Sequence, residues 1–499
     1  MSEPVTRRKI LTDYRIRVAK CEICGKTYFP PKWFCNIEGR RSRMSFRDYF
    51  YSKGFLYSGT VIRRPTNRFE YIGSFLAGIV SLEDGPRVPG RITDFVPPEE
   101  EVDISEFIGR GVVPRFRKTY EDGPQGLIYY SSLNFSFLDD YYPYQTYVRI
   151  KPSERNDKPG IVGYGVYLPK FRIKNRSAEE AQGVQERTVP FADEDTTTFA
   201  VEAGKRALIH AALDGRYIRK CFVGSESTPY AVKPTMATVV QALELGEPYE
   251  DGFVSGGVDT QFACKAASDL FIDAAALVAF PAFRGGSVMV IGSDNSQAAR
   301  DDPLDFTVGA GAAAFIFGDR DVIATLDHYV SYTSDTPDFY RREGSKYPRH
   351  GGRFTGKPAY FKHVVTAMKL VMKESGLTPK DFNYVVLHSP NARYPFQAAL
   401  EAGFQPDQVN PSLFVRWIGN LYSGSSLTAL AGILDVAEPG DRILMASYGS
   451  GAGSDAYIFT VTKAIEEKRS RTIPVKDQIE NPHRQYVDYH TYRRWKEME

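Results

Sequence analysis

From Gly160 onward, short apolar runs in this chain alternate with stretches of helical pattern. Five of the runs are expected to be strands: CFVGSES, SVMVIGSD, AAAFIFGD, YVVLHSP and RILMASYG. Apolar strands separated by helices are typical of a sheet that is covered by helices on both faces. The alternation therefore predicts an α/β domain over residues 160–463.

One helix of this domain is predicted in detail. Between Pro358 and Lys373 apolar residues recur at helical spacing, and Gly376 supplies a stop at the C-terminal end. The apolar stripe consists of Phe361, Val364, Val365, Met368 and Met372.

Residues 1–45 contain three of the five cysteines. Cys21 and Cys24 form a CxxC pair, and Cys35 follows after a Pro-Pro turn, as in most of a zinc ribbon. A closed structural zinc site needs four ligands, and Glu38 stands where a fourth cysteine would complete the set. Either Glu38 ligates through oxygen, or the hairpin keeps its shape without the metal; both alternatives stay open.

Residues 46–152 carry five β-rich runs separated by turn residues, which indicates a small β-barrel. A ribbon followed by such a barrel, with EDGPQGLIYY in its last part, resembles the zinc-ribbon and OB-fold family that accompanies thiolase-type enzymes and acyl-CoA chemistry. The polar segment from Ser153 to Gly160 is expected to link the barrel to the α/β domain. Residues 464–499 form a charged, tyrosine-rich tail, for which packing on the barrel, packing on a second subunit and mobility all stay open.

Composition narrows the function classes. With 42% hydrophobic and 25% charged residues, the 499-residue chain has the composition of a folded protein. A formal charge of +2 provides no global field for nucleic acid or an anionic membrane, so neither is an expected partner. The polar start at Met1 is not that of a signal peptide, no apolar run is long enough to cross a bilayer, and five cysteines fit a reducing compartment. We expect a cytoplasmic protein.

Three residues are candidates for catalysis. Cys264, in FACKAASDLF, is expected at the N-terminus of a buried helix, whose dipole would stabilise its thiolate for acyl transfer. A buried cysteine taken alone is more often a small apolar residue. Glu226 and His388 each follow an apolar strand, where catalytic groups of α/β folds gather, although a solvated carboxylate and a hydrogen-bonded core histidine are the ordinary alternatives.

Further polar and glycine-rich segments follow. Asn420 lies in WIGNLYSGSS, while Gly449 and Ser450 lie in a glycine-rich turn after RILMA. Such turns bring backbone N–H groups close to a ligand, as an oxyanion hole requires.

The ordered segments together resemble the archaeal-type 3-hydroxy-3-methylglutaryl-CoA synthases of the thiolase superfamily. They are SESTPYAVKPT, FACKA, YTSDTPDFYRREG, HSPN, IGNLYSGSS and SYGSGAGSDA, and the resemblance runs from Ile161 to about Thr462. It implies a thiolase fold of two similar α/β halves in αβαβα layers. It also implies that Cys264 is the acylated nucleophile, Glu226 the general acid/base and His388 the group that orients the acceptor carbonyl, with Asn420, Gly449 and Ser450 in support. Basic residues become candidates for CoA contacts: Lys233, Arg353, Lys357 and Arg393.

The implied reaction condenses acetyl-CoA with acetoacetyl-CoA, for isoprenoid synthesis, with no cofactor for the chemistry and at most a structural zinc. A homodimer and an acetoacetyl-CoA thiolase partner are implied as well. Ser389, Ala392 and Arg393 depart from the family's HQPNGKFP, which keeps open a related condensing or thiolytic enzyme for another ketone-bearing acyl-CoA. The third alternative is a non-catalytic CoA-binding scaffold for a thiolase.

Overall fold

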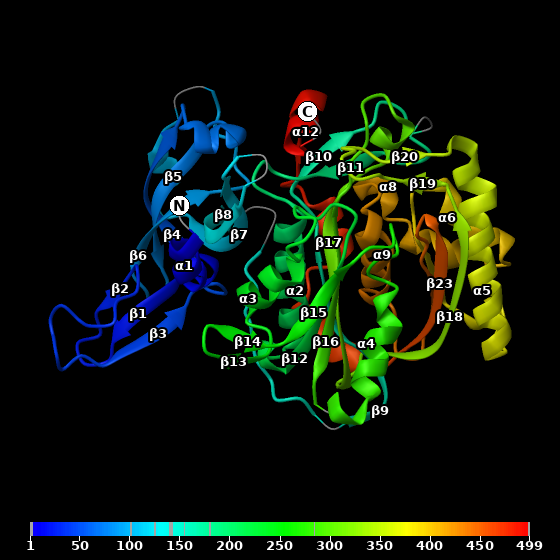
Figure 1. Cartoon of the computed structure of the whole chain (residues 1–499), viewed down its shortest axis with the longest axis horizontal. Coiled ribbons are helices and arrows are strands. Elements are labelled where there is room, and N and C mark those ends of the chain that lie inside the picture. The colour runs from blue at the N-terminus through cyan, green and yellow to red at the C-terminus, as the bar shows by residue number, and fades with distance from the viewer. Residues whose placement is uncertain are drawn as a thin grey trace. The chain divides into compact units, whose positions relative to one another are not determined.

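The structure, a computed structural model, describes residues 3–99, 102–123, 126–138, 143–153, 155–178, 181–283 and 285–497. The chain divides into two compact units (Figure 1). Unit 1 comprises Met1–Tyr147 and Phe191–Glu194, and unit 2 comprises Val148–Pro190 and Asp195–Glu499. Among the described residues, every helix is too short or too polar to cross a bilayer.

Unit 1 begins with a helix that the sequence analysis did not predict, α1 (Glu3–Arg15). It is followed by a small antiparallel sheet in the order β2-β1-β3, made of β1 (Arg17–Cys21), β2 (Thr27–Tyr28) and β3 (Met44–Asp48). Helix α1 docks on the barrel described next, since the hydroxyls of Ser131 and Ser132 donate hydrogen bonds to its last carbonyls.

The predicted barrel is confirmed. Its strands are β4 (Gly54–Ile62), β5 (Phe75–Leu82), β6 (Arg87–Ile92), β7 (Gly111–Glu121) and β8 (Ile128–Phe137), and they close in the order β4-β5-β6-β8-β7. Strands β6 and β8 run parallel, and the other pairs are antiparallel. This order fits an OB-fold barrel. Alternate residues fill the interior, among them Leu56, Leu76, Ile92 and Phe135.

Unit 2 contains a nine-stranded sheet, and all five predicted runs are strands in it. In sheet order the strands are β15 (Gly256–Thr260), β12 (Ile218–Gly224), β16 (Ser287–Asn295), β17 (Ala310–Arg320), β9 (Arg155–Tyr167), β18 (Ala324–Thr336), β23 (Gly451–Val461), β22 (Arg442–Ala446) and β21 (Tyr384–Leu387).

The sheet consists of two similar halves, as predicted. In the first half, β17 pairs antiparallel with both β9 and β16, and β16 pairs parallel with β12. In the second half, β23 pairs antiparallel with both β18 and β22, and β22 pairs parallel with β21. The sequences of pairs are β9-β17-β16-β12 and β18-β23-β22-β21.

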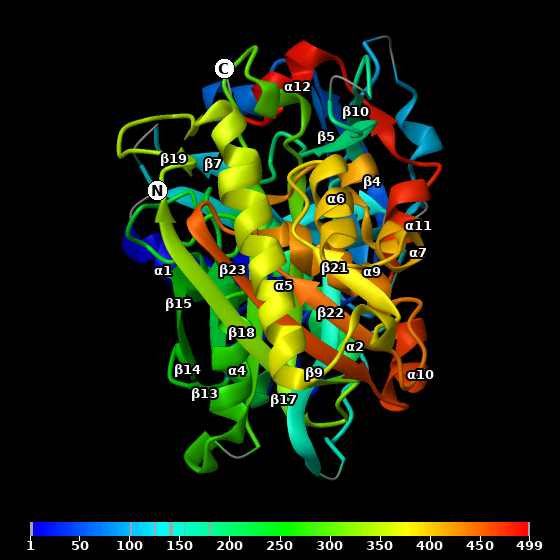
Figure 2. The same cartoon turned by 90° about the vertical axis from the view of Figure 1, so that its right-hand side faces the viewer.

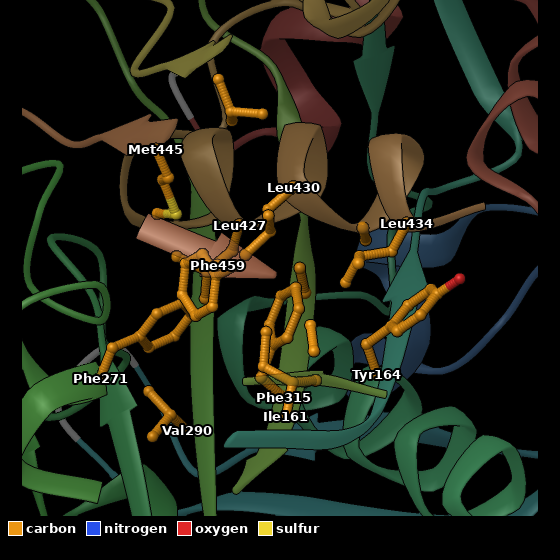
Figure 3. Packing of buried hydrophobic residues seen from close by; sticks show 14 of the residues in the cluster. Ile161, Tyr164, Phe271, Val290, Phe315, Leu427, Leu430, Leu434, Met445 and Phe459 are labelled. Atoms are coloured by element: carbon orange, nitrogen blue, oxygen red, sulfur yellow. The ribbon is translucent and has the colours of Figure 1, made fainter. Parts of the chain in front are cut away.

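Helices form three layers around the two halves. On one outer face α2 (Thr196–Ala211) and α3 (Thr235–Leu243) cover β9, β17, β16 and β12, while α5 (Lys362–Ser375) lies along β18 and β23 on the other (Figure 2). Between the halves lie α4 (Leu270–Ala279) and α9 (Ser425–Leu434). Phe271 of α4 contacts Phe315 of one half and Phe459 of the other, within the core that Figure 3 shows. These layers are the predicted αβαβα order.

The predicted stripe of α5 is buried at Val364, Val365, Met368 and Met372. Gly376 ends the helix in the left-handed conformation, with φ of 72°, where a glycine is favoured because it has no Cβ.

The tail packs on unit 2 itself, an arrangement that none of the three alternatives from the sequence included. It forms α10 (Ala464–Lys468), α11 (Val475–Glu480), β24 (Gln485–Tyr486) and α12 (Tyr489–Trp495). Strand β24 pairs with β10 (Phe171–Lys174), and the Trp495 ring contacts that of Phe171 at 4.9 Å. Lys496 donates to the carbonyl of Gly309 at 2.8 Å. Apolar burial and buried hydrogen bonds thus fix a segment whose packing the composition left open.

Candidate active site

A cavity of about 380 Å³ in unit 2 brings together four of the predicted site residues, Cys264, His388, Asn420 and Ser450. They come from distant parts of the chain, at the ends of strands or in the turns that follow them. Aromatic side chains contribute much of the remaining wall, among them Phe339, Tyr360, Tyr394, Tyr422 and Tyr448. A concave, mainly apolar space with a few converging polar groups is typical of a small-molecule site.

Cys264 lies in a series of turns rather than at a helix N-terminus, so that expectation is wrong. Helix α4 begins only at Leu270. Directly before the cysteine, Ala263 has φ of 47°, a left-handed conformation that costs free energy in a residue with a side chain. Burial first, and then the neighbouring Glu226 carboxylate, raise the pKa of the Cys264 thiol well above its ordinary value. The resting group is therefore the protonated thiol.

Glu226 contacts the thiol of Cys264, which lines the cavity. The Cys264 thiol donates a hydrogen bond to the Glu226 carboxyl group, while the carboxyl oxygen Oε1 is buried and has no hydrogen-bond partner among the described residues. Burial, followed by the negative charge of Asp294, raises the pKa of Glu226 to about 8. Because its two protonation states are close in free energy near neutral pH, such a group can both take and return a proton.

Asp294, at the end of β16, holds the segment that carries Glu226. Its Oδ1 accepts hydrogen bonds from the Ser225 hydroxyl at 2.9 Å, the Glu226 amide at 2.8 Å and the Ser227 hydroxyl at 2.7 Å. Its Oδ2 accepts from the Ser423 amide at 2.9 Å, which ties the segment to the loop before α9. Sequence reasoning missed this residue, although a carboxylate directly after the apolar run SVMVIGS was a usable signal.

His388 follows β21 and is buried. Its amide donates to the carbonyl of Ala446 at 2.9 Å, and its carbonyl accepts from the Tyr360 hydroxyl at 2.6 Å, so the main chain is fixed on both sides. The ring lies at 6.3 Å from that of Tyr448, in a stacked arrangement. Burial lowers the pKa of the imidazole to about 3, and a neutral ring can donate one hydrogen bond to a carbonyl oxygen.

Asn420 and Ser450 of the glycine-rich turn also line the cavity. The Oδ1 atom of Asn420 accepts from the Tyr422 amide at 2.9 Å. The Gly449 amide donates to the Gly453 carbonyl at 2.9 Å, and a Cβ at Gly449 would lie 2.3 Å from the Phe262 carbonyl oxygen. Within the described part of the chain, the amides of Cys264 and Ser450 have no hydrogen-bond partner. These two N–H groups are therefore the ones left to bind an oxyanion.

A second carboxylate that sequence reasoning missed holds this turn. Asp338 is fully buried and lines the cavity. It accepts a hydrogen bond from the Tyr448 hydroxyl at 2.5 Å and another from the Gly451 amide at 2.9 Å, on either side of Ser450. Its acidic side chain stands in the quoted segment YTSDTPDFYRREG, where nothing marked it apart from its neighbours.

Three of the candidate CoA-binding residues are not among those that line the cavity, namely Lys233, Lys357 and Arg393. Lys233 is exposed, and its Nζ donates to the Thr238 hydroxyl at 3.0 Å. Lys357 and Arg393 are exposed as well, while the side chain of Arg353 lies outside the described residues.

The three ribbon cysteines come together in unit 1, where the sulfur atoms of Cys21, Cys24 and Cys35 lie within 4.8 Å of one another. Glu38 does not belong to this cluster, although its amide donates a hydrogen bond to the sulfur of Cys35. Three thiols at this spacing fit three of the four positions of a tetrahedral zinc site.

Comparison with known proteins covers the larger part of the chain. Residues 372–461 match the family described as 3-Oxoacyl-[acyl-carrier-protein (ACP)] synthase III C terminal. A hydroxymethylglutaryl-CoA synthase of Methanopyrus kandleri is 47% identical over 356 residues, which are 69% of this chain and 98% of the relative. The hydroxymethylglutaryl-CoA synthase of Pyrococcus horikoshii is 45% identical over 67% of this chain and 94% of the relative.

Two solved structures share the fold. The structure described as MvaS in complex with 3-hydroxy-3-methylglutaryl coenzyme A matches with a TM-score of 0.61 at 22% identity, over 69% of this chain and 92% of its own. The 3-oxoacyl-[acyl-carrier-protein] synthase III from Aquifex aeolicus matches with a TM-score of 0.54 at 22% identity, over 60% and 99%. Both bear out the thiolase-type fold predicted for this part of the chain.

Proposed function

Because this chain belongs to the hydroxymethylglutaryl-CoA synthase family, we propose that it condenses acetyl-CoA with acetoacetyl-CoA. The products are 3-hydroxy-3-methylglutaryl-CoA and free CoA, and the reaction passes through an acetyl group on Cys264. The observation that carries the proposal is the hydrogen-bonded pair of Cys264 and Glu226 beside a cavity that also contains the neutral His388.

Acetylation comes first. The Glu226 carboxylate accepts the thiol proton of Cys264 as the sulfur attacks the carbonyl carbon of acetyl-CoA. The amides of Cys264 and Ser450 stabilise the oxyanion of the tetrahedral intermediate. Its collapse breaks the bond to the CoA sulfur, which takes the proton and leaves as free CoA.

Condensation follows on the acetylated cysteine. Glu226 removes a proton from the methyl group, and the resulting enolate carbon attacks the ketone carbon of acetoacetyl-CoA. His388 donates a hydrogen bond to that ketone oxygen, on which negative charge develops, and the alkoxide then takes the proton that Glu226 removed from the methyl group. Water finally cleaves the thioester to Cys264 and releases 3-hydroxy-3-methylglutaryl-CoA, leaving the free thiol.

The test is CoA release from acetyl-CoA in the presence of acetoacetyl-CoA, with product masses recorded for wild type, Cys264→Ala and Glu226→Ala. Formation of 3-hydroxy-3-methylglutaryl-CoA by wild type alone is the expected result. Acetylation of Cys264 without condensation would favour the related enzyme for another ketone-bearing acyl-CoA. That alternative rests on Ser389, Ala392 and Arg393, which depart from the family's HQPNGKFP. Their neighbours Asn391 and Tyr394 line the cavity. A folded protein that is never acetylated would point to the scaffold.

The finer assignments belong to the same proposal. Asn420 supports the oxyanion site, while Lys233, Arg353, Lys357 and Arg393 provide charge for the CoA phosphates at the surface. We place the enzyme in the mevalonate pathway and in the cytoplasm. We divide the chain into a zinc ribbon over residues 1–45, an OB barrel over 46–152, a synthase domain over 160–463 and a tail over 464–499. Unit 1 would hold a structural zinc ion at Cys21, Cys24 and Cys35. It is also the part of the chain that we propose to bind an acetoacetyl-CoA thiolase.

We further propose a homodimer that forms through β15, an edge strand with β12 as its one neighbour in the sheet. An edge strand offers unpaired backbone groups to a second chain. Large apolar side chains are exposed on and near this edge, namely Val258, Val254 and Tyr249. Val258→Lys should lower the mass that light scattering measures from that of a dimer to that of a monomer.

A further inference from the structure

Unit 1 contains a cavity of its own, of about 440 Å³, between α1 and the outer wall of the barrel. Its floor is formed by β5 and β6, the second and third strands of the barrel, and by residues of β8. The segment between the first two strands contributes Phe69, and Tyr120 of β7 and Tyr129 of β8 flank the turn between the last two. Strands 2 and 3 and these two connections are the surface on which OB-fold barrels bind their ligands.

Polar atoms without partners converge on this cavity. Arg91 is 7% exposed and lines it from β6. Its Nη2 atom is occupied by Asp193, at 2.5 Å, and by the carbonyl of Lys118, at 3.3 Å, but Nε and Nη1 are buried without a partner among the described residues. The hydroxyls of Thr119 and Tyr120, which also line the cavity, are buried and unpartnered in the same way.

Buried polar groups of this kind are rare in folded proteins, because each one costs free energy when it is left without a hydrogen bond. A cationic guanidinium group and two hydroxyls that face one cavity are therefore matched to an anionic, hydrogen-bonding ligand. A second cation, Lys9 of α1, lies on the same wall.

Much of the rest of the lining is aromatic, and it also includes Asp13, Ser131 and Asn134. Phe69 and Phe75 lie with ring centroids 5.9 Å apart, and Tyr120 and Tyr129 are stacked at 4.4 Å. Aromatic surfaces on an OB barrel bind flat bases by stacking, and the cation beside them binds phosphate. We propose that this cavity of unit 1 binds a phosphorylated purine nucleoside, either as a free mononucleotide or as the nucleotide end of CoA.

The test is isothermal titration of the full-length protein with adenosine 5′-monophosphate, adenosine and 3′-phosphoadenosine 5′-phosphate, the last being the nucleotide end of CoA. The monophosphate should bind to one site per chain, more tightly than adenosine, because Arg91 and Lys9 contact the phosphate. Tighter binding of the bisphosphate than of the monophosphate would identify CoA as the source, and equal binding would identify a free mononucleotide.

Substitutions test whether the nucleotide binds in this cavity. Arg91→Gln should weaken binding by about tenfold or more, and Thr119→Val, which replaces a hydroxyl by a methyl group of similar size, by about threefold. Arg87→Gln, an exposed residue at the start of the same strand and outside the cavity lining, and Cys264→Ala, in the other unit, should leave it unchanged. Since Arg91→Gln removes an ion-pair partner of the buried Asp193, which then keeps Thr93 and Arg117, Thr119→Val is the variant whose folding is least at risk.

Two results would overturn the proposal. One is nucleotide binding that neither Arg91→Gln nor Thr119→Val weakens, or no binding at all. The other is tighter binding of an eight-residue oligothymidylate that displaces the monophosphate, since a single-stranded nucleic acid would then be the ligand. The readout is binding at unit 1, so it succeeds or fails independently of the condensation assay.

Discussion

The backbone amide of Glu226 donates a hydrogen bond to Oδ1 of Asp294 at 2.8 Å, and the charge of Asp294 adds to burial in raising the pKa of the Glu226 carboxyl. Asp294 therefore both places the proposed base and tunes it. Each effect has its own measurable consequence, because the position depends on hydrogen bonds and the pKa depends on charge.

The rate of condensation should rise with pH through the pKa of Glu226, about 8. The deprotonated carboxylate is the form that accepts a proton in both half-reactions, so activity is low below this value and reaches its maximum above it. Measurement of kcat/KM for acetyl-CoA from pH 6 to 9.5 should show one ascending limb with its midpoint about one unit or less from 8. An activity that is already maximal at pH 6 would contradict the assignment of Glu226.

Asp294→Asn should move that midpoint to lower pH, by about one unit, because the substitution removes a negative charge that disfavours the ionised form of Glu226. The same change should lower stability by about 1–3 kcal/mol, since the new amide group faces the Ser423 amide, which is also a donor. Ser227→Ala is the matched control: it removes one hydrogen bond to Asp294 but no charge. A similar shift of the midpoint in both variants would exclude the electrostatic explanation.

His388→Ala should separate the two half-reactions. Burial holds the pKa of His388 at about 3, so the ring stays neutral and should contribute no limb to the profile between pH 5 and 9. Condensation should fall by about 100-fold or more, while acetylation of Cys264 changes little. Mass spectrometry of the acetyl-enzyme, beside product formation, measures both rates. Equal losses in the two would assign His388 to acetylation as well.

Local apolar patterns in the sequence predicted most of the fold. Five strands of the unit 2 sheet, the barrel strands and the stripe of α5 were predicted, because each leaves a repeating signal within a few residues. Long-range packing left no such signal: β24 pairs with β10, far away in the sequence, and so fixes a tail that composition alone left undecided.

Some residues of the candidate site were likewise predicted from local segments, and others were not. Cys264, Glu226 and His388 stand in ordered segments that resemble a known family, whereas the partners of Asp294 at Ser423 and of Asp338 at Tyr448 are more than a hundred residues away. Their importance comes from hydrogen bonds that only the folded chain forms. The prediction that Cys264 lies at a helix N-terminus was wrong for a local reason, because turns separate the cysteine from the first residue of α4.

The ribbon should hold close to one zinc ion per chain. Three sulfur atoms within 4.8 Å of one another would repel as thiolates without a cation, so removal of the metal should lower the unfolding temperature of unit 1. Metal analysis should find about one equivalent in wild type, little in Cys24→Ser, and an unchanged amount in Glu38→Ala, since the Glu38 side chain lies outside the cysteine cluster. A metal-free wild type that unfolds at the same temperature with and without added zinc would favour the ribbon without its metal.

Asp338→Ala should slow acetylation of Cys264 by about 10- to 100-fold, because it releases the Tyr448 hydroxyl and the Gly451 amide and so frees the turn that carries Ser450. KM for acetyl-CoA should change less than kcat, since Asp338 acts through the oxyanion site. Asp338→Asn keeps an acceptor for the Gly451 amide and should recover part of the rate. The charge of Asp338 also raises the pKa of Cys264. In both variants, therefore, the thiol should react with iodoacetamide at lower pH than in wild type, even though acetylation is slower. A purely structural defect would slow acetylation without moving the pH dependence of alkylation.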